Sequence, residues 1–379
     1  MKRILALILG GLLLLQLVIP ALAVETDLDI SSKSCLLMER ETGTVLYEEN
    51  AHEQLEPASV TKIMTMLLVM EAIEDGSLKL DDVVTTSAYA AGMGGSQVFL
   101  EEGEQMTVDE MLKAVAVASG NDAAVALAEH LRGSESVFVE DMNRKAQELG
   151  MLDTTFKNCT GLPEEGHVTS AYDIALMSQA LLKHDTIRDY TGIWMDELRN
   201  GEFQLANTNK LIYYYDGATG LKTGSTNAAG YCISATALRD DMELIAVILG
   251  AETSDKRFND AKTLLNYGFG GWAVTDQTPE GLLPAIPVRL GQSETVQPIL
   301  EESVRLLLKK EAVSSVQTEL LLEEELEAPV NKGDQVGTFV VYVGETEAGS
   351  YPVIAGQTVE RRSFWDIFLE LMGAVLPKL

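Results

Sequence analysis

A serine and a lysine three residues apart precede a long apolar run. Ser59 and Lys62 belong to the segment Pro57-Ala-Ser-Val-Thr-Lys62, the one place where a lysine follows a serine at this spacing. Residues three apart lie on one face of a helix, so the two side chains can touch. Burial would lower the pKa of the lysine, and the neutral amine could then take the hydroxyl proton. The pair therefore predicts a nucleophilic serine that needs no histidine, with a simple helix start as the alternative.

Two later segments carry polar groups that could share a cleft with this pair. Ser119 and Asn121 flank Gly120, which can end one helix just before Asn121 or Asp122 begins the next. Such a corner can aim two short polar side chains into a cleft, although helix punctuation alone explains it. The segment Lys222-Thr-Gly224 lies at the end of a predicted strand, where the lysine brings positive charge and the glycine lets a ligand approach the backbone. A solvated lysine at a strand end is the alternative.

The elements that would position these groups are mostly helices between two β segments. The helix expected to carry Ser59 has apolar residues on every side from Ile63 to Ile73, which predicts a buried helix. Residues 75–106 are turn-rich and suit a lid or loop beside a cleft. Further helices are predicted over residues 107–118, 121–131, 135–149, 170–183 and 255–268, and strands over 35–39, 44–48, 219–223, 231–238 and 242–249, with a turn over 224–230.

The chain changes in character after residue 273. Prolines and a glycine over residues 274–290 predict a linker, and short alternating runs over residues 286–358 predict a small all-β domain with a spacing or interaction role. In the tail, residues 359–379, apolar side chains from Phe364 to Leu376 fall at helical spacing. A helix of this length, about 20 Å, is too short to cross roughly 30 Å of hydrocarbon. We expect it to lie on a membrane surface, with docking on the protein as the alternative and its acidic face a point against anionic lipid.

Composition and the first residues place the protein outside the cytoplasm. Residues 1–23 combine Lys2-Arg3, an apolar run and Ala21-Leu-Ala23, which predicts a cleaved secretory signal peptide, with a retained anchor as the alternative. The formal net charge of −30 argues against binding to nucleic acid. Three cysteines do not make a disulfide framework, although one pair could form, and the four histidines lack metal-ligand spacing. We therefore expect no metal and no cofactor.

The three short motifs, in this order and in a secreted chain, resemble the penicillin-binding protein and serine β-lactamase superfamily. The closer resemblance is to its low-molecular-mass branch, the D-alanyl-D-alanine carboxypeptidases, and it covers the chain from about residue 26 to the tail. The residues that carry it are Pro57-Ala-Ser-Val-Thr-Lys62, Ser119-Gly-Asn-Asp-Ala123, Phe156-Lys-Asn-Cys-Thr-Gly-Leu162, His167-Val-Thr-Ser-Ala-Tyr-Asp173, Asn207-Thr-Asn209, Gly220-Leu-Lys-Thr-Gly224, Ala229-Gly-Tyr-Cys232 and Lys256-Arg-Phe-Asn259.

This resemblance implies an α/β (α+β) fold. An antiparallel sheet flanked by helices would form a catalytic domain over residues 24–273. A helical subdomain would be inserted between Ser59 and Lys222, and a β-sandwich-like domain would follow. The helices and strands predicted above from residue patterns also place helices between two β segments.

The resemblance also implies a reaction on peptidoglycan stem peptides that end in D-Ala-D-Ala. Ser59 would attack the carbonyl between the two D-alanines, with Lys62 as the base. Ser119 would relay a proton to the leaving amine, which Lys222 polarises, and Asn121 would orient Lys62 and the substrate amide.

Substrate-binding groups would lie at the other end of the site. Thr223 and Arg257 would hold the terminal carboxylate of the substrate, and Gly224 would let the substrate approach the strand. Backbone N–H groups of Ser59 and Ser225 would form the oxyanion hole.

The enzyme would act in the cell envelope, at the outer face of the cytoplasmic membrane, and β-lactam antibiotics would inhibit it covalently. No E-x-x-L-N segment follows Ser119-Gly-Asn121, so the deacylating glutamate of class A β-lactamases lacks a candidate and bound β-lactams should leave slowly. Endopeptidase or β-lactamase activity on the same site, or a non-catalytic wall-binding role, are the alternatives.

Overall fold

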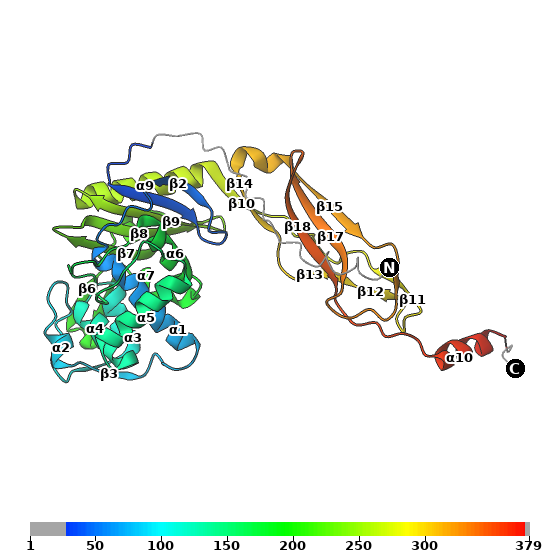
Figure 1. The fold of residues 1–379 in the computed structure, drawn as a ribbon, viewed down its shortest axis with the longest axis horizontal. Helices are drawn as coiled ribbons and strands as arrows, with labels where there is room; N and C mark the ends of the chain where they lie inside the picture. The colour runs from blue at the N-terminus through cyan, green and yellow to red at the C-terminus, as the bar shows by residue number, and fades with distance from the viewer. Residues whose placement is uncertain (1–27, 376–379) are drawn as a thin grey trace, which may run out of the picture.

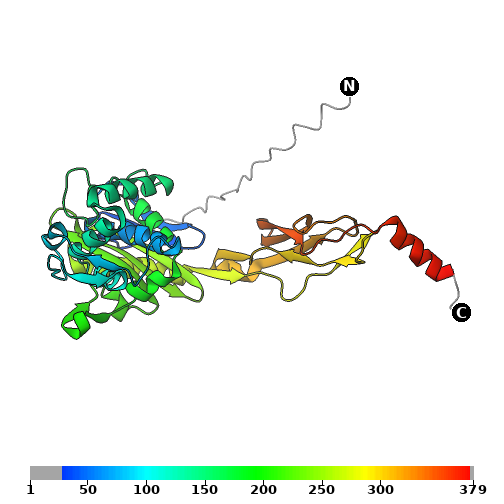
Figure 2. The ribbon, with the colours of Figure 1, turned by 90° about the horizontal axis from the view of Figure 1, so that it is seen from below.

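The structure, a computed structural model, describes residues 28–375, and these form an elongated molecule with three successive parts (Figures 1 and 2). A mixed helix-and-sheet part comes first, an all-β part follows, and a terminal helix lies at the far end from the first part. The signal peptide expected over residues 1–23 lies outside the described residues.

A five-stranded antiparallel sheet in the order β2-β1-β9-β8-β7 organises the first part. Its strands are β1 (Ser34–Glu39), β2 (Val45–Glu49), β7 (Ala218–Thr226), β8 (Gly230–Arg239) and β9 (Met242–Ala251). The central strand β9 alternates its side chains between two cores. Ile245 and Val247 face the core built around α1, whereas Leu244 and Ala246 face the core covered by α9. Both faces of the sheet are thus closed by helices, as Figure 1 shows for α9 and α6.

The helical subdomain and its connections lie between β2 and β7. Their elements are η1 (Ala58–Thr61), α1 (Lys62–Glu74), β3 (Val83–Thr85), α2 (Ala88–Ala91), β4 (Gln105–Thr107), α3 (Val108–Ala116), α4 (Asn121–Arg132), α5 (Glu135–Glu148), α6 (Ala171–Leu181), η2 (Asp185–Ile187), α7 (Arg188–Thr191), β5 (Met195–Leu198), η3 (Arg199–Gly201), β6 (Phe203–Ala206) and α8 (Leu211–Tyr214). After the sheet, α9 (Ser254–Gly271) returns across it. The fold class expected from the sequence is confirmed.

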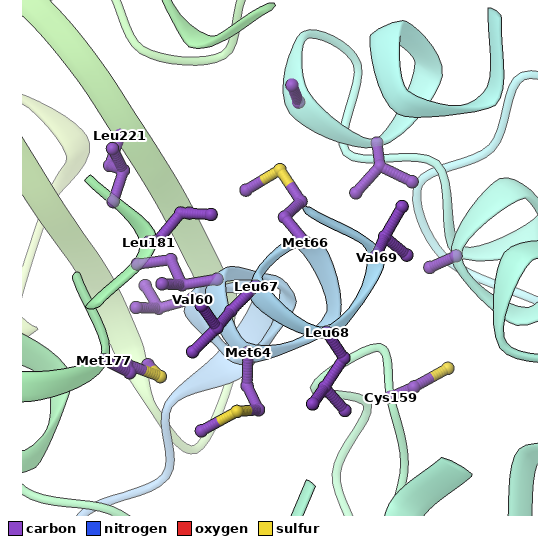
Figure 3. Packing of buried hydrophobic residues seen from close by; sticks show 14 of the residues in the cluster. Val60, Met64, Met66, Leu67, Leu68, Val69, Cys159, Met177, Leu181 and Leu221 are labelled. Carbon is purple, nitrogen blue, oxygen red and sulfur yellow. The ribbon is translucent and has the colours of Figure 1, made fainter. Parts of the chain in front are cut away.

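Helix α1 is buried along almost its whole length, as its apolar residues on every side predicted. In Figure 3, Met64, Leu67 and Leu68 point away from the helix axis into neighbours from several elements, and Met177 and Leu181 of α6 pack nearby. Helix α3 begins with the expected capping box, in which Thr107 accepts from the Glu110 N–H and the Glu110 carboxylate accepts from the Thr107 N–H.

The all-β part contains β10 (Trp272–Asp276), β11 (Ile286–Arg289), β12 (Thr295–Val296), β13 (Pro298–Leu300), β14 (Arg305–Lys309), η4 (Lys310–Ser315), β15 (Val316–Leu322), β16 (Leu326–Glu327), β17 (Gln335–Val343) and β18 (Thr346–Ala355). A sheet in the order β13-β18-β17-β15 packs over a core that includes Val288, Val341 and Val353. Helix α10 (Phe364–Val375) follows and projects beyond this part in both views (Figures 1 and 2).

Three expected boundaries differ from the structure. Residues 274–276 are not linker, because they continue β10, which pairs with β14; residues between β10 and β11 make the connection. Residues 224–226 are not turn, because β7 continues through Thr226 while pairing with β8. The stretch 75–106 contains the short elements β3, α2 and β4 as well as loops. In β10 and β7 the pairing with another strand extends the element beyond what local residue preferences signal.

Candidate active site

Ser59 lies in η1, and two glycines, Gly161 and Gly224, pack closely against the backbone of Ala58 and Ser59. A Cβ at Gly224 of β7 would lie 2.7 Å from the Ser59 nitrogen, and one at Gly161 would lie 1.8 Å from the Ala58 oxygen. Ala58 itself has a φ of 48°, a conformation that costs a non-glycine residue about 1 kcal/mol or more. Ser59 is partly exposed, whereas the residues on either side of it are buried. The local fold thus presents one hydroxyl to solvent from a tightly held backbone.

Lys62 begins α1, is fully buried, and its amine contacts three oxygens. Its Nζ lies 3.1 Å from Ser59 Oγ, 2.5 Å from Asn121 Oδ1 and 2.7 Å from the Thr160 carbonyl oxygen. Burial lowers the pKa of Lys62 to about 7. A neutral amine has two N–H groups and one lone pair. Donating to the amide and the carbonyl therefore leaves the lone pair for the Ser59 hydroxyl.

The corner before α4 places Ser119 and Asn121 as the sequence predicted. Asn121 donates from Nδ2 to the Gly94 carbonyl and from its backbone N–H to the Ser96 carbonyl, at 2.6 and 2.7 Å. These two hydrogen bonds hold the Asn121 side chain so that its oxygen, Oδ1, is directed at Lys62. Ser119 has a φ of 64°, and its buried Oγ has no hydrogen-bond partner among the described residues. That hydroxyl makes no hydrogen bond that would fix its orientation.

Lys222 lies on β7, the edge strand of the sheet, and is almost fully buried. Its Nζ donates to the Thr223 carbonyl oxygen at 3.0 Å. Burial holds the pKa of Lys222 well below its usual value, and the positive charges of Lys62 and Arg257 lower it further. For Lys62, burial is the cause that lowers the pKa, while Cys159 and Asp122 act in the opposite direction.

Arg257, from α9, reaches the far end of this strand. Its guanidinium donates at 3.3 Å to the Gly224 and Cys232 carbonyl oxygens, and its Nε has no partner among the described residues. Burial lowers the pKa of Arg257 to about 10. Ser225 is exposed one residue beyond Gly224. This end of the site therefore has a fixed positive charge behind an accessible strand end, which suits an anionic group.

Four groups that complete the site were not assigned roles from the sequence. The Thr160 carbonyl holds Lys62, and Thr208 Oγ1 accepts from Thr223 Oγ1 at 2.7 Å. His167 contacts Thr61 Oγ1 at 2.9 Å, and Arg199 donates to the carbonyl oxygens of Val98 and Phe99 in the loop over Asn121. Thr160, His167 and Thr208 lie within segments that carried the family resemblance, which is the signal that could have marked them.

Neither a metal site nor a membrane-spanning helix accompanies this arrangement in residues 28–375. No group of three or more His, Cys, Asp or Glu side chains there could hold a metal ion. No helix in the same range is long and apolar enough to cross a bilayer. The chemistry at hand is that of a serine hydroxyl, two lysines of lowered pKa and an amide.

Two protein families match this chain. The family described as D-alanyl-D-alanine carboxypeptidase matches residues 21–253, and the penicillin-binding protein 5 C-terminal domain matches residues 283–361. The chain is 43% identical to the D-alanyl-D-alanine carboxypeptidase DacF of Bacillus subtilis, over 98% of each sequence. It is 35% identical to DacC of Escherichia coli, over 90% of this chain and 88% of that protein.

Solved structures are similar in fold as well. Penicillin-binding protein 5 from Haemophilus influenzae matches with a TM-score of 0.74 at 28% identity, covering 88% of this chain and 98% of that one. Penicillin-binding protein D2 from Listeria monocytogenes, in its ampicillin-bound form, matches with a TM-score of 0.56 at 33% identity. That match covers 64% of this chain and 99% of the Listeria chain.

Proposed function

The chain belongs to the D-alanyl-D-alanine carboxypeptidase family and is a serine-type enzyme of that class, and on this premise we propose that it works through an acyl-enzyme on Ser59. The resemblance and the reaction class predicted from the motifs are confirmed. The observation that carries the proposal is the 3.1 Å contact between the Ser59 hydroxyl and the buried amine of Lys62. A lysine with a pKa of about 7 is half neutral at physiological pH and can act as a general base.

Acylation begins when Ser59 Oγ attacks the carbonyl carbon between the two D-alanines, while its proton passes to Lys62 Nζ. The C–N bond then breaks, and the leaving amine of the terminal D-alanine takes up the proton that Lys62 accepted, which leaves Lys62 neutral again. Ser119 relays this proton, because its buried Oγ has no other partner among the described residues. Lys222 polarises the relay, and Asn121 keeps the Lys62 amine aligned throughout.

The negative charge of the tetrahedral intermediate falls on the carbonyl oxygen. Backbone N–H groups of Ser59 and Ser225 form the oxyanion hole, each donor contributing about 3 kcal/mol to transition-state stabilisation. Thr223 and Arg257 hold the terminal carboxylate, and Gly224 leaves room for the substrate beside the strand. The fixed charge of Arg257 at this end supports the assignment.

Deacylation by water releases the shortened stem peptide. In residues 28–375, the hydrogen-bond partners of Lys62 are a hydroxyl, an amide oxygen and a carbonyl oxygen, with no carboxylate that could act as a separate base. Lys62 is therefore the base for this step too. A β-lactam, whose leaving group stays tethered to the acyl-enzyme, should leave slowly. Rapid turnover of a penicillin by the purified enzyme would overturn this assignment.

The decisive assay measures D-alanine release from a short peptide ending in Lys-D-Ala-D-Ala. We expect release by the wild type and by Ser350→Ala, an exposed serine on β18, and no release by Ser59→Ala. Release by Ser59→Ala would show that another residue is the nucleophile. If the wild type releases no D-alanine but still binds penicillin covalently, the substrate is cross-linked peptidoglycan and the enzyme is an endopeptidase.

We also propose that α10 holds the enzyme on the outer face of the cytoplasmic membrane. Phe364, Trp365 and Leu369 are 73%, 67% and 65% exposed, which favours a membrane surface over docking on the protein. The test is co-sedimentation of the full chain with vesicles of neutral and of anionic lipid. We expect binding by the wild type and loss of binding by Trp365→Glu/Leu369→Glu. Equal binding by both proteins would contradict the proposal.

A further inference from the structure

Asp122, the residue after Asn121 in α4, is a fully buried acidic residue that takes no part in the proposed reaction. Its carboxylate accepts from the Val98 N–H at 3.0 Å, the Leu100 N–H at 3.1 Å and the Ala123 N–H at 2.9 Å. The first turn of a helix favours an acidic residue, because the N–H groups there carry partial positive charge. An exposed aspartate would serve that purpose as well, and burying a carboxylate is costly. The burial of Asp122 therefore points to a further role.

Two of the three N–H groups come from a loop, residues 94–100, whose backbone is strained between them. Phe99 has a φ of 57°, a left-handed conformation that a residue with a bulky side chain rarely adopts. Strained backbone of this kind persists only where the surroundings fix it. Val98 and Leu100, on either side of Phe99, are buried and both donate to the Asp122 carboxylate. One carboxylate thus fixes the backbone on both sides of the strained residue.

The same loop also holds the catalytic amide. Asn121 Nδ2 donates to the Gly94 carbonyl at 2.6 Å, and the Asn121 N–H donates to the Ser96 carbonyl at 2.7 Å. Asn121 Oδ1 in turn lies 2.5 Å from Lys62 Nζ. The contacts of Asp122 therefore lead through the loop to the amide and from there to the amine that activates the serine.

Two neighbouring residues fit a role of Asp122 in holding this loop. Residue 120 is a glycine, and a Cβ there would lie 2.9 Å from Asp122 Oδ1, so the glycine leaves room for the carboxylate. The Arg199 guanidinium donates to the Val98 and Phe99 carbonyl oxygens. The segment around Phe99 is thus bonded through its N–H groups by a carboxylate and through its carbonyl groups by a guanidinium.

We propose that Asp122 is a positioning residue for acylation, which acts through the loop 94–100 to hold Asn121 in the orientation that aligns Lys62. The inference rests on the proposed function and deepens it. In the described part of the chain, Asp122 forms no hydrogen bond with Ser59 or Lys62. Its contribution should therefore appear in kcat and should disappear when the Asn121 amide is removed.

The first test compares Asp122→Asn, which keeps the size of the side chain, with Asp173→Asn in D-alanine release from a peptide ending in Lys-D-Ala-D-Ala. Asp173 is a matched control, because it is also buried in the first turn of a helix, α6, and also accepts from a loop. Its partners are the Asp153 N–H and the Thr154 hydroxyl, at 2.8 and 2.6 Å.

We expect Asp122→Asn to lower kcat about tenfold and to change KM less than about threefold, because the groups that hold the terminal carboxylate are untouched. Asp122→Ala, which removes both oxygens, should lower kcat further than Asp122→Asn, which keeps one. Asp173→Asn should leave kcat and KM unchanged.

The second test asks whether Asp122 acts through Asn121. The rate constant for acylation by a fluorescent penicillin is measured for Asp122→Asn, Asn121→Ala and the double variant, with circular dichroism and urea unfolding to verify folding. We expect the double variant to match Asn121→Ala within about twofold, because the amide that Asp122 positions is already absent. A general loss of folded protein would instead slow the wild type and Asn121→Ala by the same factor. Gly120→Ala, whose Cβ would displace the carboxylate, replaces Asp122→Asn in both tests if that variant does not fold.

Three outcomes would overturn the proposal. The first is an unchanged kcat in Asp122→Asn, and the second is an equal fall of kcat in Asp173→Asn. The third is a double variant slower than Asn121→Ala by the full factor seen in Asp122→Asn alone, because Asp122 would then act independently of the amide. Failure of the proposed function is distinguishable from these, since it would appear as no release by the wild type or as release by Ser59→Ala.

Discussion

The pH dependence of acylation follows directly from the burial of Lys62. With a pKa of about 7, the neutral fraction of this amine rises from about one tenth at pH 6 to about nine tenths at pH 8. The second-order rate constant for acylation by a penicillin should therefore rise about tenfold over this interval and then level off. A lysine with the ordinary pKa of 10.5 would instead give rates that increase tenfold per pH unit up to about pH 10.

The size of the effect can be worked out from the same shift. At pH 7 an ordinary lysine is neutral in about 3 molecules in 10,000, whereas Lys62 is neutral in about half. Burial therefore raises the population of the active base roughly 1,500-fold, which corresponds to about 4 kcal/mol. Lys62→Arg should remove both the activity and the pH midpoint, because a guanidinium stays protonated throughout.

The assay is labelling of the purified protein by a fluorescent penicillin from pH 5.5 to 9.5, with circular dichroism at each pH to verify folding. Lys222→Gln serves as the companion variant, because Lys222 also has a lowered pKa. It should label more slowly but keep a midpoint near 7. A labelling rate that does not change with pH in the wild type would refute the assignment of Lys62 as the base. So would a pH midpoint that is lost in Lys222→Gln while Lys62→Arg is still labelled by penicillin.

Three further predictions concern the groups around the site. Gly224→Ala places a Cβ 2.7 Å from the Ser59 nitrogen, so the rate of labelling by penicillin should fall at least a hundredfold. The control is Gly270→Ala, where no atom lies within 4 Å of the new Cβ and the labelling rate should not change. Arg199→Ala releases the loop over the active site and should lower kcat about tenfold with little change in KM, and Arg199→Lys should recover part of it. Burial lowers the pKa of His167 to about 4, so the folded state binds fewer protons than the unfolded state between about pH 4 and 6.5. The free energy of unfolding, measured with urea, should therefore fall by about 2 kcal/mol from pH 7 to pH 5. The His167→Gln variant should lose less over the same interval.

Local patterns in the sequence identified the catalytic chemistry and most of the helices. The spacing of Ser59 and Lys62 follows from helix geometry, and the burial of α1 follows from apolar residues on all of its sides. Caps are equally local, and Thr107 and Glu110 form the expected capping box. Strand limits were less well predicted, because Gly224 has poor strand preference and residues 224–226 extend β7 by pairing with β8.

Only the tertiary structure decided what surrounds the catalytic groups. Lys62 receives the side chain of Asn121 from 59 residues away and the Thr160 carbonyl from 98 residues away. No local pattern encodes these contacts, and the pKa of Lys62 depends on the water that the whole subdomain excludes. The ring contact between Trp194 and Tyr213 has the same origin, because the path of the chain through β5 and β6 to α8 brings the two residues together. The sequence by itself thus determined which residues could react, whereas the fold determined their protonation and orientation, because desolvation and long-range contacts arise only when distant segments pack together.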